Sequence, residues 1–480
     1  MKRDLDSLEI RHLVTDSRKV GPGDTFVAYV GEKMDGRQFI GDAIRSGAAS
    51  VIWEKEDFSW NAAWQVPNLP VANLRAKAGE IASHVYGYPA EKLWIVGVTG
   101  TNGKTSSAHW IAQALTRMGK KTAVIGTLGN GFPGALSPTI NTTPDAVALH
   151  GLLANYLAEG ANCIAMEVSS HALVQGRVNG IHFDVALLTN LTRDHLDYHG
   201  DMAAYGAAKA GLFERPELRY AILNLDDSFG FEIMKKAMPA QKIAFGFSDI
   251  REKMRVRGKN LRVQGGMLVM DVESSWGNGI VDSPVVGRFN ASNLLGVLCV
   301  LLASGYGFSE SVEALSAIEA VPGRMQQLGG KDAPLVVVDY AHTPDALESV
   351  LKTLREIVPG AGRLTCVFGC GGDRDRGKRP VMGKIASSLS DHVILTSDNP
   401  RGENPGAIIA EIAGGIEGNY CVELDRGKAI SRAILGSDME DVVLLAGKGH
   451  EDYQEINGER VPFSDMEVAR SALESRGMGC

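Results

Sequence analysis

The segment with the clearest chemical potential is Thr99-Gly-Thr-Asn-Gly-Lys-Thr105, which follows an apolar run and precedes the helical stretch Ser106–Met118. Glycines let backbone N–H groups approach an oligophosphate, and the N-terminus of the following helix favours negative charge. Lys104 can bridge the β- and γ-phosphates of a nucleotide, and the hydroxyl of Thr105 suits Mg²⁺. This context predicts a phosphate-binding loop made of Gly100, Thr101, Asn102, Gly103, Lys104, Thr105 and Ser106.

The loop departs from the common form G-x-x-x-x-G-K-[ST], because Val98 stands where that form has glycine. This departure disfavours a GTPase or an ordinary kinase. Further along, Glu167 ends a strand-like run, where a lone carboxylate is either a core residue with a partner or a metal ligand. We favour a Mg²⁺ ligand, because triphosphate chemistry needs a held metal. The polar segment Thr192–His199 is either a solvated loop or a further part of this site.

Parallel strands must position these groups. Short β-branched runs alternate with amphipathic helical stretches, which predicts an α/β fold. The polar clusters follow the ends of these strands, at Gly100–Thr105, Glu167–His171, Asn190–His195, Asp339–Pro344, Gly369–Arg376, Asp398–Arg401 and Gly447–Glu451. Ligands of open parallel sheets bind outside the carboxyl ends of the strands, so we expect two α/β domains whose functional edges face each other.

The chain of 480 residues is too long for one compact domain. Turn-rich breaks near Tyr86–Pro89 and Val321–Arg324 divide it into 1–90, 91–322 and 323–480. Glycine and alternating apolar residues over 250–287 predict a small antiparallel appendage, and the apolar run Leu294–Ala303 predicts a buried helix that is too short to cross a bilayer.

The composition excludes several classes of protein. A net charge of −8 disfavours nucleic-acid binding, although a local pocket can still be basic. The first residues are charged where a secretory signal would be apolar, and the scattered cysteines form no disulfide framework or zinc site, so we expect reduced thiols. A cytoplasmic protein without membrane contact is therefore predicted.

Taken together, the motifs resemble the Mur ligases along essentially the whole chain, and among them the diaminopimelate-adding members most closely. Those that carry the resemblance are Asp16–Arg18, Thr99–Thr105, Asn141–Thr143, Glu167–Arg177, Asp194–Gly200, Tyr205–Lys209, Phe289–Asn293, Pro322–Met325, Asp339–Asp345, Gly371–Asp375, Asp398–Arg401 and Lys448–Glu451. The number and order of these motifs exclude coincidence.

The resemblance implies three domains: an N-terminal UDP-binding α/β domain, a central P-loop-type ATPase domain with a mostly parallel sheet, and a C-terminal Rossmann-like domain. Thr15 and Ser17 would contact the uridine end of the substrate. The muramoyl-dipeptide would be held by Asn141, Thr142, Thr143, Ser169, Gln175 and Arg177. The nucleotide would also contact Asn290, Asn293, Arg324 and Asp339. Two Mg²⁺ ions would be bound by Thr105, Glu167, His195 and Lys209, with Lys209 carbamylated.

The resemblance further implies the reaction. A substrate carboxylate attacks the γ-phosphoryl of ATP, and the amine of meso-2,6-diaminopimelate then attacks the acyl phosphate. Lys104, His195 and Lys209 would be catalytic, and His342 is a candidate base from its position alone. The string Asp398-Asn-Pro-Arg401 accompanies diaminopimelate, whose distal carbon bears a carboxylate that lysine lacks. That end would contact Arg374, Asp398, Asn399, Pro400, Arg401, Gly447 and Glu451.

The expected product is a peptidoglycan precursor, formed by a monomer from UDP-N-acetylmuramoyl-L-alanyl-D-glutamate, diaminopimelate and ATP. Competing readings are a lysine-adding ligase, a folylpolyglutamate synthase with the same phosphate loop, and a protein that uses ATP as a switch to bind a partner. A silent paralogue is disfavoured because Lys104, Thr105, Glu167, His195 and Lys209 are all retained.

Overall fold

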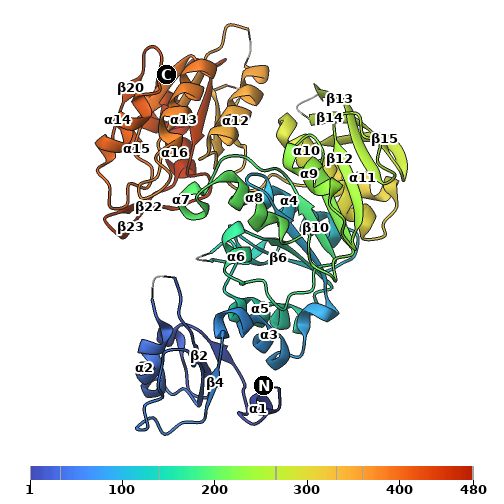
Figure 1. Cartoon of the computed structure of the whole chain (residues 1–480). Helices are drawn as coiled ribbons and strands as arrows, with labels where there is room; N and C mark the ends of the chain where they lie inside the picture. Colours follow the sequence, from blue (N-terminus) through green and yellow to red (C-terminus); the bar gives the residue numbers. More distant parts are fainter. Residues whose placement is uncertain are drawn as a thin grey trace.

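The computed structural model describes residues 2–32, 34–139, 141–264, 267–330, 332–358 and 360–477. It contains three α/β regions in chain order (Figure 1). Cys480 lies outside the described residues, so its predicted thiol state is not tested. The five described cysteines are free; Cys421 is exposed and the others are buried. No helix of the described chain is long and apolar enough to cross a membrane.

The N-terminal region is a four-stranded parallel sheet in the order β1-β2-β3-β4. Its elements are α1 Lys2–Asp6, β1 Leu13–Val14, η1 Ser17–Lys19, β2 Thr25–Ala28, η2 Gly36–Phe39, α2 Ile40–Arg45, β3 Ser50–Glu54, β4 Asn68–Val71, α3 Leu74–Val85 and η3 Pro89–Lys92. The β-branched and aromatic residues of β2 and β3 are buried, as expected for a covered sheet.

Helix α3 packs on two regions at once. Leu74, Ala78 and Ile81 share a buried cluster with strands of the N-terminal sheet and with Ala146 and Val147 of helix α5 (Ala146–Ala158). Gly79 lies so close to the carbonyl of Asn179 that a Cβ atom would overlap it, and Asn179 Nδ2 donates to Ala76 O at 3.0 Å. The N-terminal region is therefore joined to the centre by packed side chains as well as by the chain itself.

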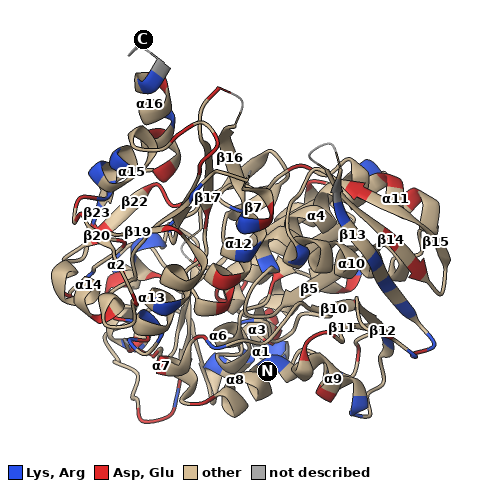
Figure 2. Cartoon of the chain, turned by 90° about the horizontal axis from the view of Figure 1, so that it is seen from above, with Lys and Arg blue, Asp and Glu red and all other residues tan. Residues whose placement is uncertain are grey.

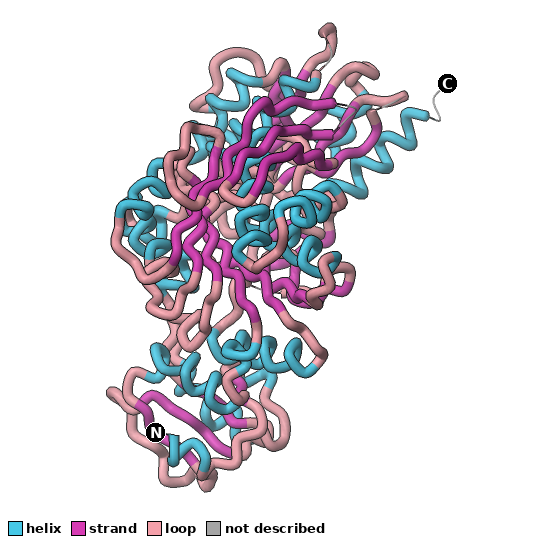
Figure 3. The backbone as a smooth tube through the Cα atoms, turned by 90° about the vertical axis from the view of Figure 1, so that its right-hand side faces the viewer, coloured by secondary structure: helices cyan, strands magenta, loops and turns pink. Residues whose placement is uncertain are grey.

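The central region is an eleven-stranded sheet in the order β15-β14-β13-β12-β11-β10-β5-β9-β6-β7-β8. Its strands are β5 Trp94–Thr99, β6 Thr122–Gly126, β7 Gly129–Phe132, β8 Ala135–Ser137, β9 Cys163–Glu167, β10 Val185–Leu188, β11 Tyr220–Asn224, β12 Gln241–Gly246, β13 Arg255–Gln264, β14 Met267–Ser274 and β15 Gly277–Ser283. Its further helices are α4 Lys104–Arg117, α6 Ser170–Val174, α7 Leu196–His199, α8 Met202–Ala210, α9 Ser228–Lys235, α10 Arg288–Ala303 and α11 Phe308–Ser316. Figure 3 shows the strands between layers of helices.

The inner strands, from β12 to β6, pair in parallel, and helix α10 is buried along nearly its whole length. The prediction of a buried helix at Leu294–Ala303 is therefore confirmed. The predicted appendage is antiparallel, but it is not separate, because β13 pairs in parallel with β12 and extends the main sheet. Two of its cations are paired with acids, in Lys259–Glu273 and Arg262–Asp271. Figure 2 shows the Lys and Arg residues along β13.

The C-terminal region is a six-stranded sheet in the order β16-β17-β21-β18-β19-β20, with only β16 antiparallel. Its strands are β16 Gln326–Gly329, β17 Leu335–Asp339, β18 Leu364–Phe368, β19 His392–Leu395, β20 Cys421–Val422 and β21 Val442–Ala446, followed by the separate hairpin β22 Tyr453–Ile456 and β23 Glu459–Pro462. Its helices are α12 Pro344–Ile357, α13 Lys378–Leu389, α14 Pro405–Ala413, α15 Arg426–Leu435 and α16 Asp465–Gly477. The carboxyl ends of its parallel strands carry the predicted polar clusters.

Candidate active site

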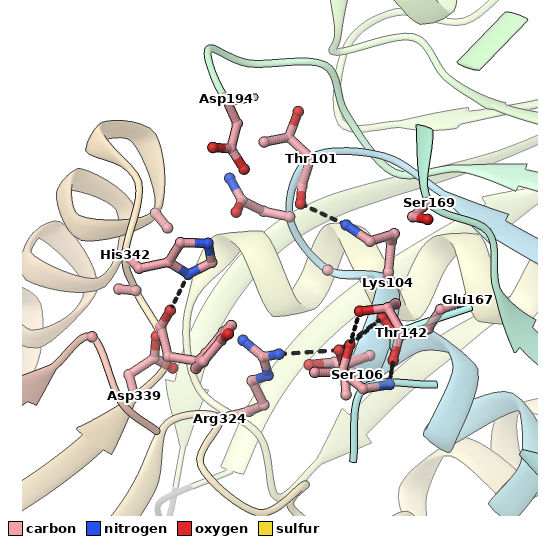
Figure 4. A pocket seen from close by; sticks show the side chains of 18 of the residues that line it. Thr101, Lys104, Ser106, Thr142, Glu167, Ser169, Asp194, Arg324, Asp339 and His342 are labelled. Carbon is pink, nitrogen blue, oxygen red and sulfur yellow. Dashed lines mark hydrogen bonds between the residues drawn. The ribbon is translucent and has the colours of Figure 1, made fainter. Parts of the chain in front are cut away.

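One cavity of about 1550 Å³ lies between the central and C-terminal sheets and also reaches Glu32 of the N-terminal region. The clusters that follow β5, β9, β10, β17, β18, β19 and β21 all contribute to its wall. The expectation that the functional edges of two α/β domains face each other therefore holds. Figure 4 shows the phosphate-loop end of this cavity.

Lys104 of the phosphate loop is held by backbone carbonyls of the same loop. Lys104 Nζ donates to the carbonyls of Gly100 and Thr101, each at 2.9 Å. Asn293 lies so close to Gly103, whose φ is 84°, that a Cβ atom there would meet its Oδ1 at 2.5 Å. Glycine is therefore required both by the left-handed backbone and by this contact.

A second lysine shares the loop. Lys209 is 1% exposed, and its Nζ donates to Gly100 O at 2.8 Å, so two amines meet at one carbonyl. Burial, and then the charge of Lys104, lower the pKa of Lys209 well below its usual value. Burial likewise lowers the pKa of Lys104. Within the described chain neither lysine forms an ion pair with a carboxylate, so neither amine has a fixed countercharge among the described residues.

Glu167 is completely buried, and its side-chain hydrogen-bond partners among the described residues are all neutral. Its Oε2 accepts from Thr105 Oγ1 at 3.0 Å and from Thr127 Oγ1 at 3.2 Å, while Oε1 accepts from Thr127 N at 2.7 Å. A buried carboxylate without a paired cation is costly, so this position favours a bound cation.

A hydroxyl and a carboxylate suit Mg²⁺, which is usually held by one or two carboxylates together with phosphate oxygens and water. The described residues contain no cluster of three or more His, Cys, Asp or Glu that would hold a metal unaided. The residues present thus fit a metal that arrives with a nucleotide, and they do not form an independent metal cage.

Asp194 and His195 form a close pair at the end of the loop after β10. Asp194 Oδ1 accepts from His195 N at 2.9 Å, and its Oδ2 lies 3.2 Å from His195 Nε2. Desolvation lowers the pKa of His195, although Asp194 opposes this effect. His195 has a left-handed φ of 54°, which this local contact helps to hold.

His342 faces the same cavity from the C-terminal region (Figure 4). Its Nδ1 donates to Tyr340 O at 2.8 Å, which leaves Nε2 as the unprotonated nitrogen of the neutral ring. Burial lowers the pKa of His342 to about 4, so the ring is neutral near pH 7. Position and tautomer are compatible with the predicted role as a base.

The C-terminal region contacts the phosphate loop directly. Arg324 Nη2 donates to Thr105 Oγ1 at 3.0 Å, and Asn102 Nδ2 donates to Asp345 Oδ2 at 3.0 Å. Met325 N donates to the predicted nucleotide contact Asp339 at 2.8 Å, and burial raises the pKa of this carboxyl. Through these contacts, residues of the central and C-terminal regions together surround the phosphate loop.

The predicted dipeptide contacts lie beside this loop. Arg177 Nη1 donates to Thr143 O at 2.9 Å, and its Nε donates to Gln175 Oε1 at 2.6 Å. Thr143 Oγ1 in turn donates to the backbone carbonyl of Glu167 at 2.8 Å, so the group is joined to the end of strand β9. Asn141, Thr142, Thr143, Ser169, Gln175 and Arg177 all line the cavity.

The amino-acid end is built on Asp398–Arg401. Asn399 Nδ2 donates to Glu451 Oε2 at 2.8 Å, and the buried Lys448 donates to the same oxygen at 2.9 Å. Arg401 Nε donates to Glu455 Oε2 at 3.1 Å. Arg374 is exposed on the cavity wall and forms no hydrogen bond or ion pair with the described chain.

A buried arginine holds the two loops of this end together. Arg379 is fully buried and donates to Gly371 O at 3.1 Å and to Glu403 at 2.8 and 3.0 Å. Glu403 Oε1 also accepts from Asp373 N at 2.6 Å. The loops that carry Arg374 and Arg401 are thus fixed to one salt bridge.

Most predicted site residues line the one cavity. Those that do so are Thr101, Asn102, Gly103, Lys104, Thr105, Ser106, Asn141, Thr142, Thr143, Glu167, Ser169, Gln175, Arg177, His195, Lys209, Asn290, Asn293, Arg324, Asp339, Arg374, Asp398, Asn399, Arg401, Gly447 and Glu451. Gly100 and Pro400 shape its loops without lining it, and Thr15 and Ser17 lie outside it, in the N-terminal region.

Sequence reasoning missed several residues of the wall. Glu32 accepts from Tyr198 OH at 2.6 Å, and the ring of His171 lies 4.1 Å from that of Tyr198, centre to centre. Glu455 and Arg460 of the β22–β23 hairpin also line the cavity. His171 and Tyr198 belong to motifs named in the sequence analysis, but their contact could not be predicted from the sequence. Glu32 and the hairpin lie outside every such motif.

Comparison with known proteins agrees with this geometry. Residues 9–86 match the model "Mur ligase family, catalytic domain", 98–301 the "Mur ligase middle domain" and 323–449 the "Mur ligase, glutamate ligase domain". The chain belongs to the Mur ligase family. The predicted α/β fold in three regions is confirmed as the Mur ligase fold.

Curated Mur ligases match over nearly the full length. The UDP-N-acetylmuramoyl-L-alanyl-D-glutamate--2,6-diaminopimelate ligase of Nitrosomonas europaea is 51% identical, covering 97% of this chain and 93% of that protein. The ligase of the same name from Chromobacterium violaceum is 50% identical over 98% of this chain and 95% of its own.

Among solved structures, a UDP-N-acetylmuramoyl-L-alanyl-D-glutamate--2,6-diaminopimelate ligase is 37% identical, with a TM-score of 0.68, covering 98% of this chain and 95% of that one. A MurF ligase of Thermotoga maritima in complex with ADP is 20% identical with a TM-score of 0.68, covering 98% of each chain. The latter shares the fold, and this fold also occurs in a folylpolyglutamate synthase of Mycobacterium tuberculosis, 17% identical with a TM-score of 0.62 over 78% of this chain and 92% of its own.

Proposed function

We propose that this Mur ligase adds meso-2,6-diaminopimelate to UDP-N-acetylmuramoyl-L-alanyl-D-glutamate and converts ATP to ADP and phosphate, as a step of peptidoglycan precursor synthesis. The observation that carries the proposal is that Asp398–Arg401 and the phosphate loop line one cavity. An arginine fork suits the distal carboxylate of diaminopimelate. The relatives that bear this activity in their names are about half identical to the chain over nearly its full length.

In the proposed reaction the substrate carboxylate attacks the γ-phosphorus of ATP, the bond to the bridging oxygen of ADP breaks, and an acyl phosphate forms. The amine of diaminopimelate then attacks the acyl carbon, loses a proton and expels phosphate. Lys104 neutralises the transferring phosphoryl group, an interaction type typically worth a few kcal/mol. Arg177 and His195 orient the dipeptide, and His342 Nε2 is the candidate acceptor of the amine proton.

Thr105 and Glu167 would hold one Mg²⁺ ion, and Glu167 and His195, together with carbamylated Lys209, would hold a second. The metal would balance phosphate charge during the transfer. The nucleotide would contact residues 100–106 with Asn290, Asn293, Arg324 and Asp339, and Thr15 and Ser17 would contact uridine.

Carbamylation of Lys209 belongs to the same proposal. Only a neutral amine attacks CO₂, and burial beside Lys104 favours the neutral form. Attack forms an N–C bond and releases one proton, which leaves an anion on Lys209. Two amines at the Gly100 carbonyl would then become a cation and an anion, which replaces repulsion by attraction.

We further propose that the enzyme acts as a cytoplasmic monomer and that its domains span 1–90, 91–322 and 323–480. Neither point is needed for the chemistry. Size-exclusion chromatography with light scattering tests the first, and limited proteolysis at the two junctions tests the second.

The decisive experiment measures ATP-dependent phosphate release with the muramoyl-dipeptide present, and compares meso-diaminopimelate with L-lysine. Turnover with diaminopimelate alone, lost in Arg401→Ala, supports the proposal. Turnover with lysine would keep the ligase and remove the assigned specificity. No stimulation by the muramoyl-dipeptide would instead favour a folylpolyglutamate synthase, and hydrolysis without any co-substrate would favour an ATP switch.

A further inference from the structure

The hairpin β22–β23 is fixed to the segment Asp398–Arg401. Arg401 N donates to Glu455 O at 2.9 Å, and Asn457 N donates back to Arg401 O at 2.8 Å. Gln454 Nε2 donates to Asp398 O at 2.8 Å. Because backbone and side-chain bonds both join the two segments, the position of Glu455 relative to Arg401 is set by the fold.

These bonds aim the guanidinium of Arg401. Its Nε donates to Glu455 Oε2 at 3.1 Å and its Nη1 to Gly372 O at 2.8 Å, while its backbone has a left-handed φ of 51°. No hydrogen bond to a described residue uses Arg401 Nη2 or Glu455 Oε1. Both side chains line the cavity and stay partly exposed, at 22% and 29%. The Nη2 amino group of Arg401 and the Oε1 oxygen of Glu455 therefore remain available to a ligand on two paired side chains.

The other carboxylate of this end differs from Glu455. Glu451 Oε2 already accepts from Asn399 and from the fully buried Lys448, and Tyr340 OH lies 3.4 Å from its Oε1. Its Oε2 is therefore committed to a buried cation, whereas its Oε1 can still accept from a ligand at this end, as predicted from the sequence. Glu455, in contrast, is paired with Arg401, and a ligand that binds Arg401 would share this cation with Glu455.

A ligand carboxylate on Arg401 would lie next to the carboxylate of Glu455, and two anions this close repel each other. The repulsion is relieved when the carbon that bears the ligand carboxylate also bears an ammonium, because Glu455 Oε1 can accept from it. Specificity arises from such a penalty against the wrong ligand as much as from attraction to the right one.

We propose that Glu455 is a specificity-determining residue that selects a zwitterionic distal end, with carboxylate and ammonium on one carbon, over a distal carboxylate alone. The inference rests on the proposed function and adds to it a contact for the distal ammonium. Arg401 excludes a ligand without a distal carboxylate, and Glu455 excludes a ligand without a distal ammonium.

The test is steady-state phosphate release by Glu455→Gln with meso-diaminopimelate and with 2-aminopimelate, which keeps the distal carboxylate and lacks the distal ammonium. The variant should raise KM for diaminopimelate about tenfold, leave kcat and the KM for ATP within twofold, and improve kcat/KM for 2-aminopimelate severalfold. These magnitudes are those of one charge-assisted hydrogen bond and one relieved repulsion.

Glu459→Gln, on the exposed strand of the same hairpin, is the matched control and should behave as wild type. Glu455→Asp keeps the charge and should keep most of the preference. An equal loss for both amino acids would assign Glu455 only to holding Arg401 and overturn the proposal, as would no change. If the wild-type enzyme itself fails to use diaminopimelate, the proposed function fails first and this inference falls with it.

Discussion

Lys209, at the phosphate end of the cavity, is enclosed and donates to a backbone carbonyl, whereas Arg401, at the amino-acid end, is partly exposed and paired with Glu455. The first side chain has no countercharge among the described residues, and burial favours its neutral amine, so its charge is set by the anion or the modification that it meets. The second is already half neutralised, so its ligand must match charges of both signs. The phosphate end should therefore control rate, and the amino-acid end should control affinity and selectivity.

The largest effect expected from this contrast is at Lys209. We predict that Lys209→Ala lowers kcat about 10³-fold, because it removes a charged group from the transferring phosphoryl and from the metal position. Excess bicarbonate should not rescue it, since no amine remains to be carbamylated. Phosphate release measures the loss, and Lys235→Ala, on the exposed end of α9, should behave as wild type. Near-normal turnover of Lys209→Ala would remove the carbamate from the mechanism.

At the amino-acid end we predict that Arg401→Ala raises KM for diaminopimelate about 100-fold and leaves the KM for ATP within twofold. A lost hydrogen bond to a charged group, which costs about 1.5–3 kcal/mol, accounts for most of this change. Arg401→Lys should recover little, because an ammonium cannot replace the planar fork. Substrate titrations that instead gave a fall in kcat at unchanged KM would erase the proposed difference between the two ends.

Burial of a titratable side chain also lowers the stability of the folded protein at low pH. His150 of α5 allows this effect to be measured. Burial lowers its pKa to about 4, from an ordinary value of 6.5. Between these values the unfolded chain binds a proton that the folded chain does not, so stability falls as pH drops below 6.5. The loss is on the order of 2 kcal/mol at pH 5, or about 30-fold in the unfolding equilibrium.

His150→Gln should flatten that dependence, because Gln stays neutral while its amide can still donate to Asn179 O, which lies 3.1 Å from His150 Nε2. Denaturant unfolding at pH 7 and pH 5 gives the slope. His392→Gln, at an exposed position at the start of β19, serves as the reference. Equal slopes for wild type and His150→Gln would show that this enclosed ring carries no acid sensitivity.

The smallest effect is expected where the two halves meet at the surface. Arg193 of the central region lies 3.5 Å from Asp375 of the C-terminal region and is 52% exposed. Exposed pairs contribute about 0–1 kcal/mol and weaken with salt. Arg193→Ala should therefore change kcat/KM by less than about fivefold, and the difference should shrink in high salt. A larger or salt-independent effect would mean that this pair controls closure of the cavity.

Residue order alone was sufficient for the parts of the fold that rest on local rules. The glycine–lysine loop before α4 and the apolar runs of β5, β9, β10 and β17 predict parallel strands and a shared edge, and that edge is where the clusters lie. The short strands β7, β8 and β20 and the exposed hairpin β22–β23 were not predicted. Strands β8, β20 and β23 have no buried residues, and the buried β7 contains two glycines in four residues, so the usual apolar alternation is missing from all of them.

Pairings across the cavity were also beyond sequence reasoning. Glu32 and Tyr198, or Arg401 and Glu455, are distant in the chain, and nothing in their spacing encodes a contact. Glu455 is one acidic residue of a short, partly exposed strand, and a solvated side chain is the ordinary expectation for an acidic residue. Such contacts follow from how two sheets and a hairpin pack, which is decided by long-range burial.

Helix α3 has a consequence for the length of the substrate. Its packing on both the N-terminal sheet and α5 fixes the spacing between Ser17 and the phosphate loop by buried side chains, so this span does not vary as a flexible tether would. A rigid distance between two binding sites selects ligands by their length. A ligand that reached from the proposed uridine contact at Ser17 to the phosphate loop would have to match this distance, and a ligand shortened or lengthened by one unit would miss one of the two sites.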